Sequence, residues 1–211
     1  QTTYYGGWVY GEAGDDDIRA ATSGGRLSGG AGADILTGSA QADVLYSGDV
    51  LANGQGPIDD MGLEHDTLLG LDGNDSLAAG YGDDVDGGAG SDVLQLSLGG
   101  SASGLTFSTA GIVSGQPFAL GGGVIKNVET LAYLRGTEFA DTLTLVTQDS
   151  LLLVDAGAGD DVIISSNSSV KVWGGAGNDR FVSGRAGDIF DGGAGSDTID
   201  YSAETAAMTI S

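Results

Sequence analysis

Large apolar residues recur at nine-residue intervals in three blocks of this chain. The clearest unit reads "GGAGNDRFV" from Gly174, with glycine at places one, two and four, aspartate at place six and the apolar residue at place eight. The place-eight residues are Ile18, Leu27, Leu36 and Leu45 in the first block, Leu68, Leu77 and Leu94 in the second, and Ile163, Val172, Phe181, Phe190 and Ile199 in the third.

The three residues around place eight have the outward, inward, outward alternation of a β-strand. The glycine-rich hexapeptide before them must turn, because glycine adopts backbone conformations that are closed to other residues. So short a strand cannot bury its apolar residue alone, and stacking of units solves this problem. Two units then make one coil, and successive coils add parallel strands about 4.8 Å apart. The pattern predicts an all-β solenoid whose place-eight side chains fill the space between two parallel sheets.

The repeat is interrupted twice, and one unit of the second block, "AGYGDDVD" from Ala79, is a residue short. The shorter interruption, 47–60, is predicted to be a surface loop. The longer one contains "GLTFST" and "VIKNVETLAYL", whose apolar patterns predict strands packed beside the solenoid or capping it. We therefore expect a first roll segment at 1–95, a non-repeat β insertion at 96–135 and a second roll segment at 136–211.

The two ends of the chain depart from the repeat. The first residues, "QTTYYGGWVY", are rich in aromatic rings and have two interpretations: a cap on the end coil, or a platform that binds a sugar or a protein partner. The last residues, "TIDYSAETAAMTIS", resemble the beginning of another strand insertion. We expect the chain to be a piece of a longer protein.

Charge excludes several classes of partner. The chain has 30 Asp and Glu residues against 7 Lys and Arg residues, and its formal net charge is -23. Nucleic-acid binding depends on Lys and Arg that neutralise phosphates, and anionic membranes attract basic segments, so neither partner is expected. No apolar run is long enough to span a membrane. The chain has no cysteine, which excludes disulfides and thiolate metal sites.

The aspartates at place six have a spacing that predicts metal ions. Because two units make one coil, each turn stacks on the turn eighteen residues away, and an ion between stacked turns needs an aspartate from each. The predicted sets are Asp16 with Asp34, Asp66 with Asp84, Asp75 with Asp92, and Asp161 with Asp179 and Asp197. These sets predict about five ions. Asp43, Asp141 and Asp188 also occupy place six but have no carboxylate partner at this spacing, so their role stays open.

Calcium is the ion that these ligands favour. Carboxylates are hard oxygen ligands, and Ca²⁺ accepts six to eight oxygens in flexible loops at about 2.3 to 2.6 Å. Magnesium requires a stricter octahedron, and zinc prefers His or Cys, which are nearly absent. Without metal, the stacked carboxylates repel one another, so we expect metal binding and folding to be coupled.

The repeated unit resembles the RTX family of secreted bacterial proteins, also called hemolysin-type, whose calcium-binding nonapeptide is G-G-x-G-x-D-x-U-x. The resemblance is carried by the matches at Gly29, Gly87, Gly174 and Gly192 and extends over more than half of the chain. It implies a right-handed parallel β-roll with calcium between the turns. It also implies export of the unfolded chain by a type I secretion machine to the extracellular space or the cell surface.

The resemblance further implies that backbone carbonyls at places one and three complete each calcium site. The residues at these places are Gly11, Ala13, Gly29, Ala31, Gly87, Ala89, Ala156, Ala158, Gly174, Ala176, Gly192 and Ala194.

The sequence offers little to an enzyme. The single histidine, His65, follows Glu64, but the second histidine of an H-E-x-x-H zinc motif is absent. There is no G-x-S-x-G elbow, and no glycine phrase continues as G-K-[ST]. We therefore expect no enzymatic activity and no catalytic residues.

Two functions remain after these exclusions. The leading hypothesis is a calcium-folded structural module of a secreted or cell-surface protein, such as an adhesin, surface-layer or matrix component. Such a module would associate with itself or with a partner on the cell surface or in the matrix. The alternative is an accessory module of a type I-secreted hydrolase or toxin that aids export and folding.

Overall fold

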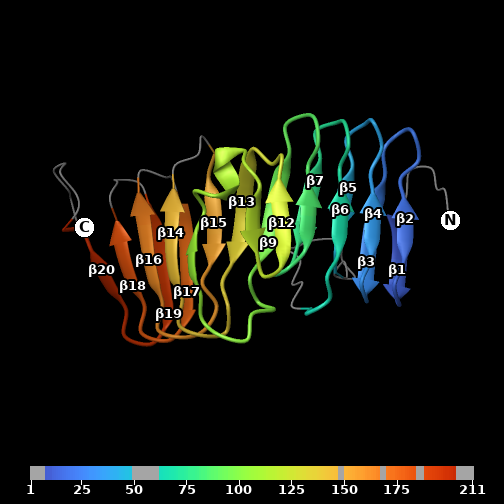
Figure 1. The fold of residues 1–211 in the computed structure, drawn as a ribbon. Coiled ribbons are helices and arrows are strands. Elements are labelled where there is room, and N and C mark those ends of the chain that lie inside the picture. Colours follow the sequence, from blue (N-terminus) through green and yellow to red (C-terminus); the bar gives the residue numbers. More distant parts are fainter. Residues whose placement is uncertain (1–7, 49–61, 147–149, 167–169, 184–187, 203–211) are drawn as a thin grey trace. The chain divides into compact units, whose positions relative to one another are not determined.

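The computed structural model describes residues 8–48, 62–146, 150–166, 170–183 and 188–202 (Figure 1). Most of the predicted surface loop at 47–60, residues 1–7 and residues 203–211 lie outside them. The chain forms two compact units, one from Gln1–Gly100 and Gly111–Tyr133, the other from Ser101–Ala110 and Leu134–Ser211. Residues of the predicted insertion 96–135 thus contribute to both units.

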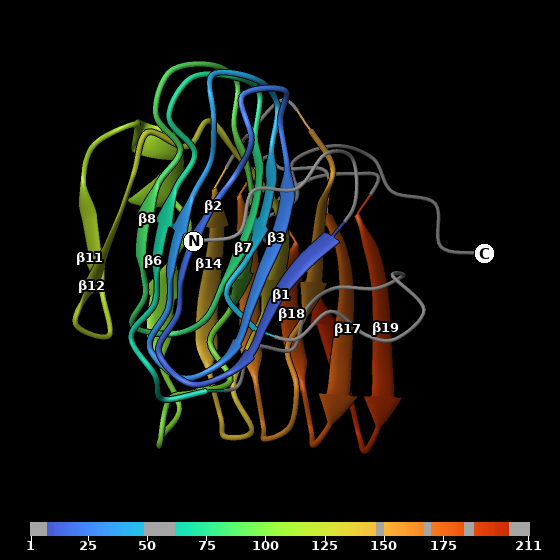
Figure 2. The same ribbon diagram turned by 90° about the vertical axis from the view of Figure 1, so that its right-hand side faces the viewer.

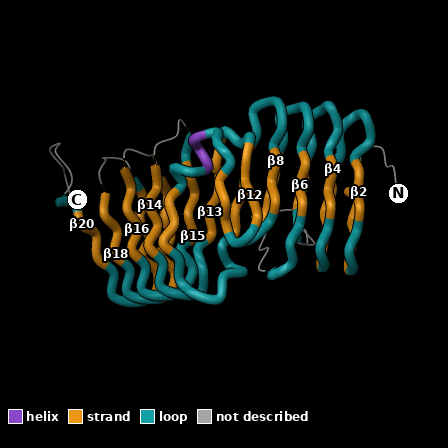
Figure 3. Tube along the Cα trace, in the orientation of Figure 1, coloured by secondary structure: helices purple, strands orange, loops and turns teal. Residues whose placement is uncertain are grey.

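The first unit is built from short strands joined by turns. Its strands are β1 (Trp8–Ala13), β2 (Asp17–Arg19), β3 (Arg26–Ala31), β4 (Ile35–Thr37), β5 (Val44–Tyr46), β6 (Thr67–Leu69), β7 (Ser76–Ala79), β8 (Asp84–Asp86), β9 (Val93–Ser97), β11 (Phe118–Leu120), β12 (Gly123–Lys126) and most of β13 (Thr130–Arg135). One short 3-10 helix, Ile112–Ser114, lies in the same unit. Figure 3 shows how each short strand ends in turns or loops.

Successive strands of the first unit alternate between two sheets (Figure 1). One sheet has the order β1-β3-β5-β7-β9-β13, and the other has the order β11-β12-β8-β6-β4-β2. The repeat strands pair in parallel, so that Leu27 lies beside Leu45 and Leu36 lies beside Leu68. The exception is the antiparallel β11–β12 hairpin, which extends the second sheet beside β8 (Figure 2).

The second unit repeats this plan. Its strands are β10 (Thr106–Ser108), β14 (Thr142–Val146), β15 (Leu152–Asp155), β16 (Val162–Ser166), β17 (Val170–Ala176), β18 (Arg180–Ser183), β19 (Ile189–Ala194) and β20 (Thr198–Asp200). One sheet has the order β10-β14-β16-β18-β20, and β15, β17 and β19 are neighbours in another. All these pairs are parallel, which confirms the predicted parallel β-roll.

The place-eight side chains form the core, because each points between the two sheets and stacks on its neighbours in adjacent coils. From Ile18 to Phe181, every predicted place-eight residue is at most 6% exposed. The last two differ: Phe190 is half-buried against Phe181 with ring centroids 4.8 Å apart, and Ile199 is 44% exposed. They lie on β19 and β20, the last described strands of their sheets, so no described coil covers them.

Aromatic rings pack against one another on the first coils. Trp8 lies 6.0 Å from Tyr10 and 5.0 Å from Tyr46, measured between ring centroids, and the Arg26 guanidinium lies 5.9 Å from the Trp8 ring. These contacts use the ring faces within the protein. Tyr10 is nevertheless 53% exposed and residues 1–7 lie outside the described residues, so the cap and the platform both remain open interpretations of this end.

Candidate metal centre

The place-six aspartates form ladders along the turns. The backbone N–H of each aspartate donates to Oδ1 of the aspartate in the next coil, as in Asp16 to Asp34 (2.8 Å) and Asp75 to Asp92 (2.8 Å). The second unit continues the same pattern from Asp161 to Asp179 (2.9 Å) and from Asp179 to Asp197 (3.0 Å). The structure thus brings these predicted partners together. In each accepting aspartate, Oδ1 is used by a backbone hydrogen bond.

The second carboxylate oxygen is left without a partner in five of these turns. Oδ2 is buried and accepts no hydrogen bond in Asp34, Asp75, Asp92, Asp161 and Asp179. These five side chains are at most 2% exposed. A buried anionic oxygen without a hydrogen bond or a counter-charge is strongly unfavourable, so each turn fits a bound cation.

The glycine at place one leaves room beside each of these oxygens. A Cβ added to Gly29 would collide with Asp34 Oδ2 and with the Ser47 carbonyl of the next coil, and a Cβ on Gly174 would collide with Asp179 Oδ2 and the Gly192 carbonyl. A carboxylate oxygen and a carbonyl oxygen therefore approach the same small space, which only glycine keeps free of side-chain atoms. Oxygen ligands of these two kinds suit Ca²⁺.

Left-handed backbone conformations shape these open turns. In the turn of Asp34, Gly30 and Gly32 have φ values of 107° and 127° at places two and four. The Gly30 N–H consequently donates to the Ser47 carbonyl (2.9 Å) and not to the carboxylate of its own turn. Leu71 takes the same left-handed conformation at place two of the Asp75 turn, with φ 77°.

Three other turns close on their own carboxylate. Asp43 Oδ2 accepts the Ser39 N–H (2.6 Å) and Oγ–H (3.0 Å), and Asp141 Oδ2 accepts the Thr137 N–H (2.7 Å). Asp83 Oδ2 accepts the Gly80 N–H (2.7 Å). In the first two, place two is Ser or Thr without a positive φ, and place four is not glycine. The residues at places two and four therefore decide whether the N–H of place two bonds the carboxylate of its own turn. Where it does not, Oδ2 is available to a cation.

The predicted pairing of Asp66 with Asp84 is wrong. The Asp66 N–H donates to Asp83 Oδ1 (3.0 Å), and Asp83 is buried at place six. The residue missing from the short unit precedes place six, so Asp84 moves to place seven on β8, where Val85 takes place eight. Asp84 instead contacts His65 Nε2 (3.1 Å) and accepts the Val124 N–H (2.8 Å).

Asp43 and Asp141 do have stacked partners, at spacings that the eighteen-residue rule misses. The Asp43 N–H donates to Asp75 Oδ1 (2.8 Å) across 32 residues, a separation that includes the interruption of the repeat. The Asp34 N–H reaches Asp66 in the same way (2.7 Å). The Asp141 N–H donates to Asp161 Oδ1 (2.7 Å) across 20 residues. Asp188 accepts the Val170 N–H (3.3 Å).

The predicted carbonyl ligands lie along the same turns. At place three, the carbonyls of Ala31, Ala89, Ala176 and Ala194 accept N–H groups of place-four glycines one coil away, at 2.7 to 2.9 Å. Ala13 pairs with Ala31 in the β1–β3 ladder, and Ala158 bridges to Ala176. At place one, Gly11, Gly87 and Gly192 adjoin the carboxylates of Asp16, Asp92 and Asp197, and Ala156 is buried.

Carboxylates alone do not complete a site in the described part of the chain. No group of three Asp, Glu, His or Cys side chains there is close enough to hold a metal ion. A calcium ion at one of these turns would need backbone carbonyls for several of its ligands, which is compatible with its high coordination number.

Burial changes the acidity of the ladder aspartates. It raises the pKa of Asp161 to about 7 and that of Asp75 to about 6, and neighbouring carboxylates contribute to both. The pKa values of Asp34, Asp92 and Asp179 are also raised, mainly by burial. Each shift means that the metal-free fold disfavours the charged carboxylate.

In calcium-stripped buffer, the folded fraction is expected to rise as the pH falls from about 8 to about 5. A carboxyl whose pKa is higher in the folded chain contributes stability that is complete below its unfolded value, 3.8, and is lost as the pH rises through about 6 for Asp75 and about 7 for Asp161. Far-UV circular dichroism over this range measures the effect. The Asp161→Asn variant carries no charge at this position and should stay folded to higher pH, and a signal that does not change with pH would contradict the expectation.

The comparison with protein families agrees with this geometry. The model of the RTX calcium-binding nonapeptide repeat matches in four copies, at residues 21–49, 62–94, 155–189 and 173–203. Together the copies cover just over half of the 211 residues. The chain belongs to the RTX calcium-binding nonapeptide repeat family. Its β-roll is a structural, calcium-binding fold, and the turns of Asp34, Asp75, Asp92, Asp161 and Asp179 all lie inside matched RTX repeats.

Two further findings add little to the RTX assignment. A search of curated proteins gives no match. Among the described residues of this RTX chain, no helix has the length and hydrophobicity needed to cross a membrane.

Proposed function

We propose that this chain is a calcium-folded structural module of a secreted or cell-surface bacterial protein, such as an adhesin, surface-layer or matrix component. The observation that carries the proposal is the set of five buried carboxylate oxygens without partners, repeated along stacked turns. In calcium-poor cytosol these charges oppose folding, so the chain stays open for export by a type I machine. In millimolar extracellular calcium, the ions neutralise them and the roll forms.

About five ions are proposed, one at each open turn. The ligands are the unpartnered oxygens of Asp34, Asp75, Asp92, Asp161 and Asp179, together with carbonyls at places one and three. Asp16 stacks on Asp34 at the start of one ladder in the first unit, and Asp197 stacks on Asp179 at the end of the ladder in the second unit.

The closed turns are expected to hold no ion, and one variant pair tests this. Asp141→Asn should leave the number of bound calcium ions unchanged, because Thr137 already satisfies Asp141. Asp161→Asn should remove at least one ion, because its Oδ2 has no other partner. Native mass spectrometry at saturating calcium counts the ions. Loss of an ion from the Asp141 variant would refute the distinction between open and closed turns.

A separate experiment distinguishes a structural module from an accessory module of a hydrolase or toxin. Calcium is added to the purified chain, and light scattering follows its mass. Ordered self-association supports the structural role. If the chain folds but stays monomeric, the mass of the intact natural protein is measured next. A catalytic domain in that protein would favour the accessory role.

A further inference from the structure

A three-residue segment of the non-repeat region takes the place of a whole repeat turn. The Gly87 N–H donates to the Lys126 carbonyl (3.2 Å), and the Thr130 N–H donates to the Asp92 carbonyl (3.1 Å). The same two bonds join repeat coils, from Gly70 to Asp86 (2.8 Å) and from Val93 to Asp75 (2.9 Å). Lys126 therefore stands at place nine and Thr130 at place seven, with only Asn127, Val128 and Glu129 between them.

Glu129 performs the part of the place-six aspartate in this shortened turn. Its Oε2 accepts the Asp92 N–H at 2.7 Å, as Asp92 Oδ1 accepts the Asp75 N–H at 2.8 Å. Glutamate has one methylene more than aspartate, which gives its carboxylate additional reach from a shorter turn. The core continues without a break, since Val128 is 1% exposed and Leu131 is fully buried.

Two oxygens converge beside Gly87 at this junction. Asp92 is fully buried, and its Oδ2 has no hydrogen-bond partner. A Cβ on Gly87 would lie 2.7 Å from that oxygen and would collide with the Asn127 carbonyl. The arrangement is the one found beside Gly29 and Gly174, except that a residue outside the repeats supplies the carbonyl.

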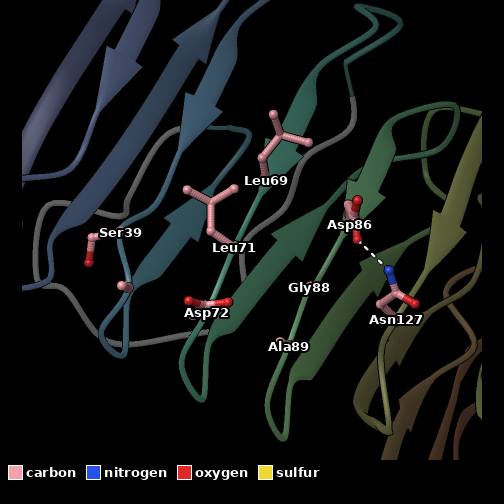
Figure 4. Close-up of a pocket in the computed structure, with 9 residues that line it drawn as sticks. Ser39, Leu69, Leu71, Asp72, Asp86, Gly88, Ala89 and Asn127 are labelled. Carbon is pink, nitrogen blue, oxygen red and sulfur yellow. Dashed lines mark hydrogen bonds between the residues drawn. The ribbon is translucent and has the colours of Figure 1, made fainter.

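Lys126, the positively charged residue next to Asn127 in the sequence, pairs with a carboxylate other than Asp92. Lys126 Nζ pairs with Asp86 Oδ2 at 3.0 Å, and Asn127 Nδ2 donates to Asp86 Oδ1 at 2.7 Å (Figure 4). These bonds direct the Asn127 side chain towards Asp86 and hold its backbone at φ 52°. They fix the segment while leaving the Asp92 oxygen without a counter-charge.

We propose that Asp92, the Asn127 carbonyl and the Glu129 carboxylate form a calcium site that ties the non-repeat segment to the repeat roll. The site rests on the proposed calcium function but lies partly outside the matched repeats, which end at residue 94 in this block. Its role is to attach the β12–β13 segment to the last open turn of the second block, so that this segment docks only when calcium is present.

The test compares Glu129→Gln with Glu138→Gln in the full chain, using native mass spectrometry and calcium titration calorimetry. Glutamine keeps an acceptor for the Asp92 N–H but removes the charge, so Glu129→Gln should lose one ion or weaken one site by roughly tenfold or more. Glu138 pairs with Arg135 in a closed turn, so its variant should bind as the wild type does. Hydrogen exchange at residues 123–133 should rise only in Glu129→Gln.

The outcomes separate this proposal from the general one. If the wild type binds calcium and Glu129→Gln binds the same number of ions with the same affinity, the junction site is overturned but the proposed function is not. No calcium binding by the wild type overturns the proposed function itself. Should Glu129→Gln fail to fold, anomalous scattering from calcium in wild-type crystals decides: an ion on both Asp92 and the Asn127 carbonyl supports the site, and its absence overturns it.

Discussion

Removal of calcium is expected to abolish most of the β structure of this chain. Five buried carboxylates lose their counter-charge at once, and the strands between them have only three to seven residues. Each ion present at about one hundred times its dissociation constant stabilises the fold by about 2.7 kcal/mol, so several ions outweigh the usual stability of a domain. Far-UV circular dichroism during titration with a calcium chelator measures the loss, and added calcium should restore the signal.

Magnesium is the control for this experiment. At equal ionic strength it screens charge as calcium does, but it prefers octahedral sites with retained water and should restore little structure. A β signal that persists unchanged in excess chelator would contradict the coupling of folding to calcium. Recovery with magnesium alone would show that screening, and not coordination, drives the transition.

The core could be predicted from the sequence because its signal is local and repeated. Each nonapeptide places one large apolar residue two positions after the aspartate. Because side chains alternate along a strand, this residue alone of the three strand residues points into the core. Leu36 and Leu68 stack even though the interruption lies between them in sequence, because strand pairing depends on the residues in register and tolerates added residues in the connection.

The metal ligands were harder to predict because their partners are set by coil geometry and not by distance along the chain. A fixed interval of eighteen residues assigned Asp84 where a single deletion makes Asp83 the stacked residue. It also missed the stacking of Asp43 on Asp75. Glu129 gave no signal at all, because only the hydrogen-bond register shows that "NVE" is a shortened turn.

The difference between open and closed turns could be seen only in the structure, although its cause is local sequence. Ser39 and Thr137 keep the backbone out of the left-handed region and supply a hydroxyl that also bonds the carboxylate. Such turns hold coils together without an ion. With calcium at the open turns, as proposed, the two kinds of turn predict that calcium controls some contacts between coils while others form independently.

Asp179→Asn is expected to be the most damaging single substitution in the second unit. Asp179 stacks between Asp161 and Asp197, and its Oδ2 is unpartnered beside Gly174, so loss of its charge weakens the sites on both sides. We expect the loss of one or two ions and destabilisation by about 3 to 4 kcal/mol in millimolar calcium, the amount that one well-occupied site contributes. Thermal unfolding and native mass spectrometry measure the two effects.

Asp160→Asn is the matched control, because it makes the same change of charge nineteen residues before Asp179, at an exposed place-five position. Asp160 Oδ1 accepts the Asn178 N–H at 2.7 Å, and an asparagine oxygen can accept it too, as Asn178 itself accepts the Ser196 N–H at 3.0 Å. Its stability should therefore change by less than about 0.5 kcal/mol, with every ion retained. If both variants lose the same stability and no ions, general charge repulsion governs this edge. If only Asp179→Asn loses ions, and the two variants become equally unfolded in chelator, the buried oxygen is the calcium ligand.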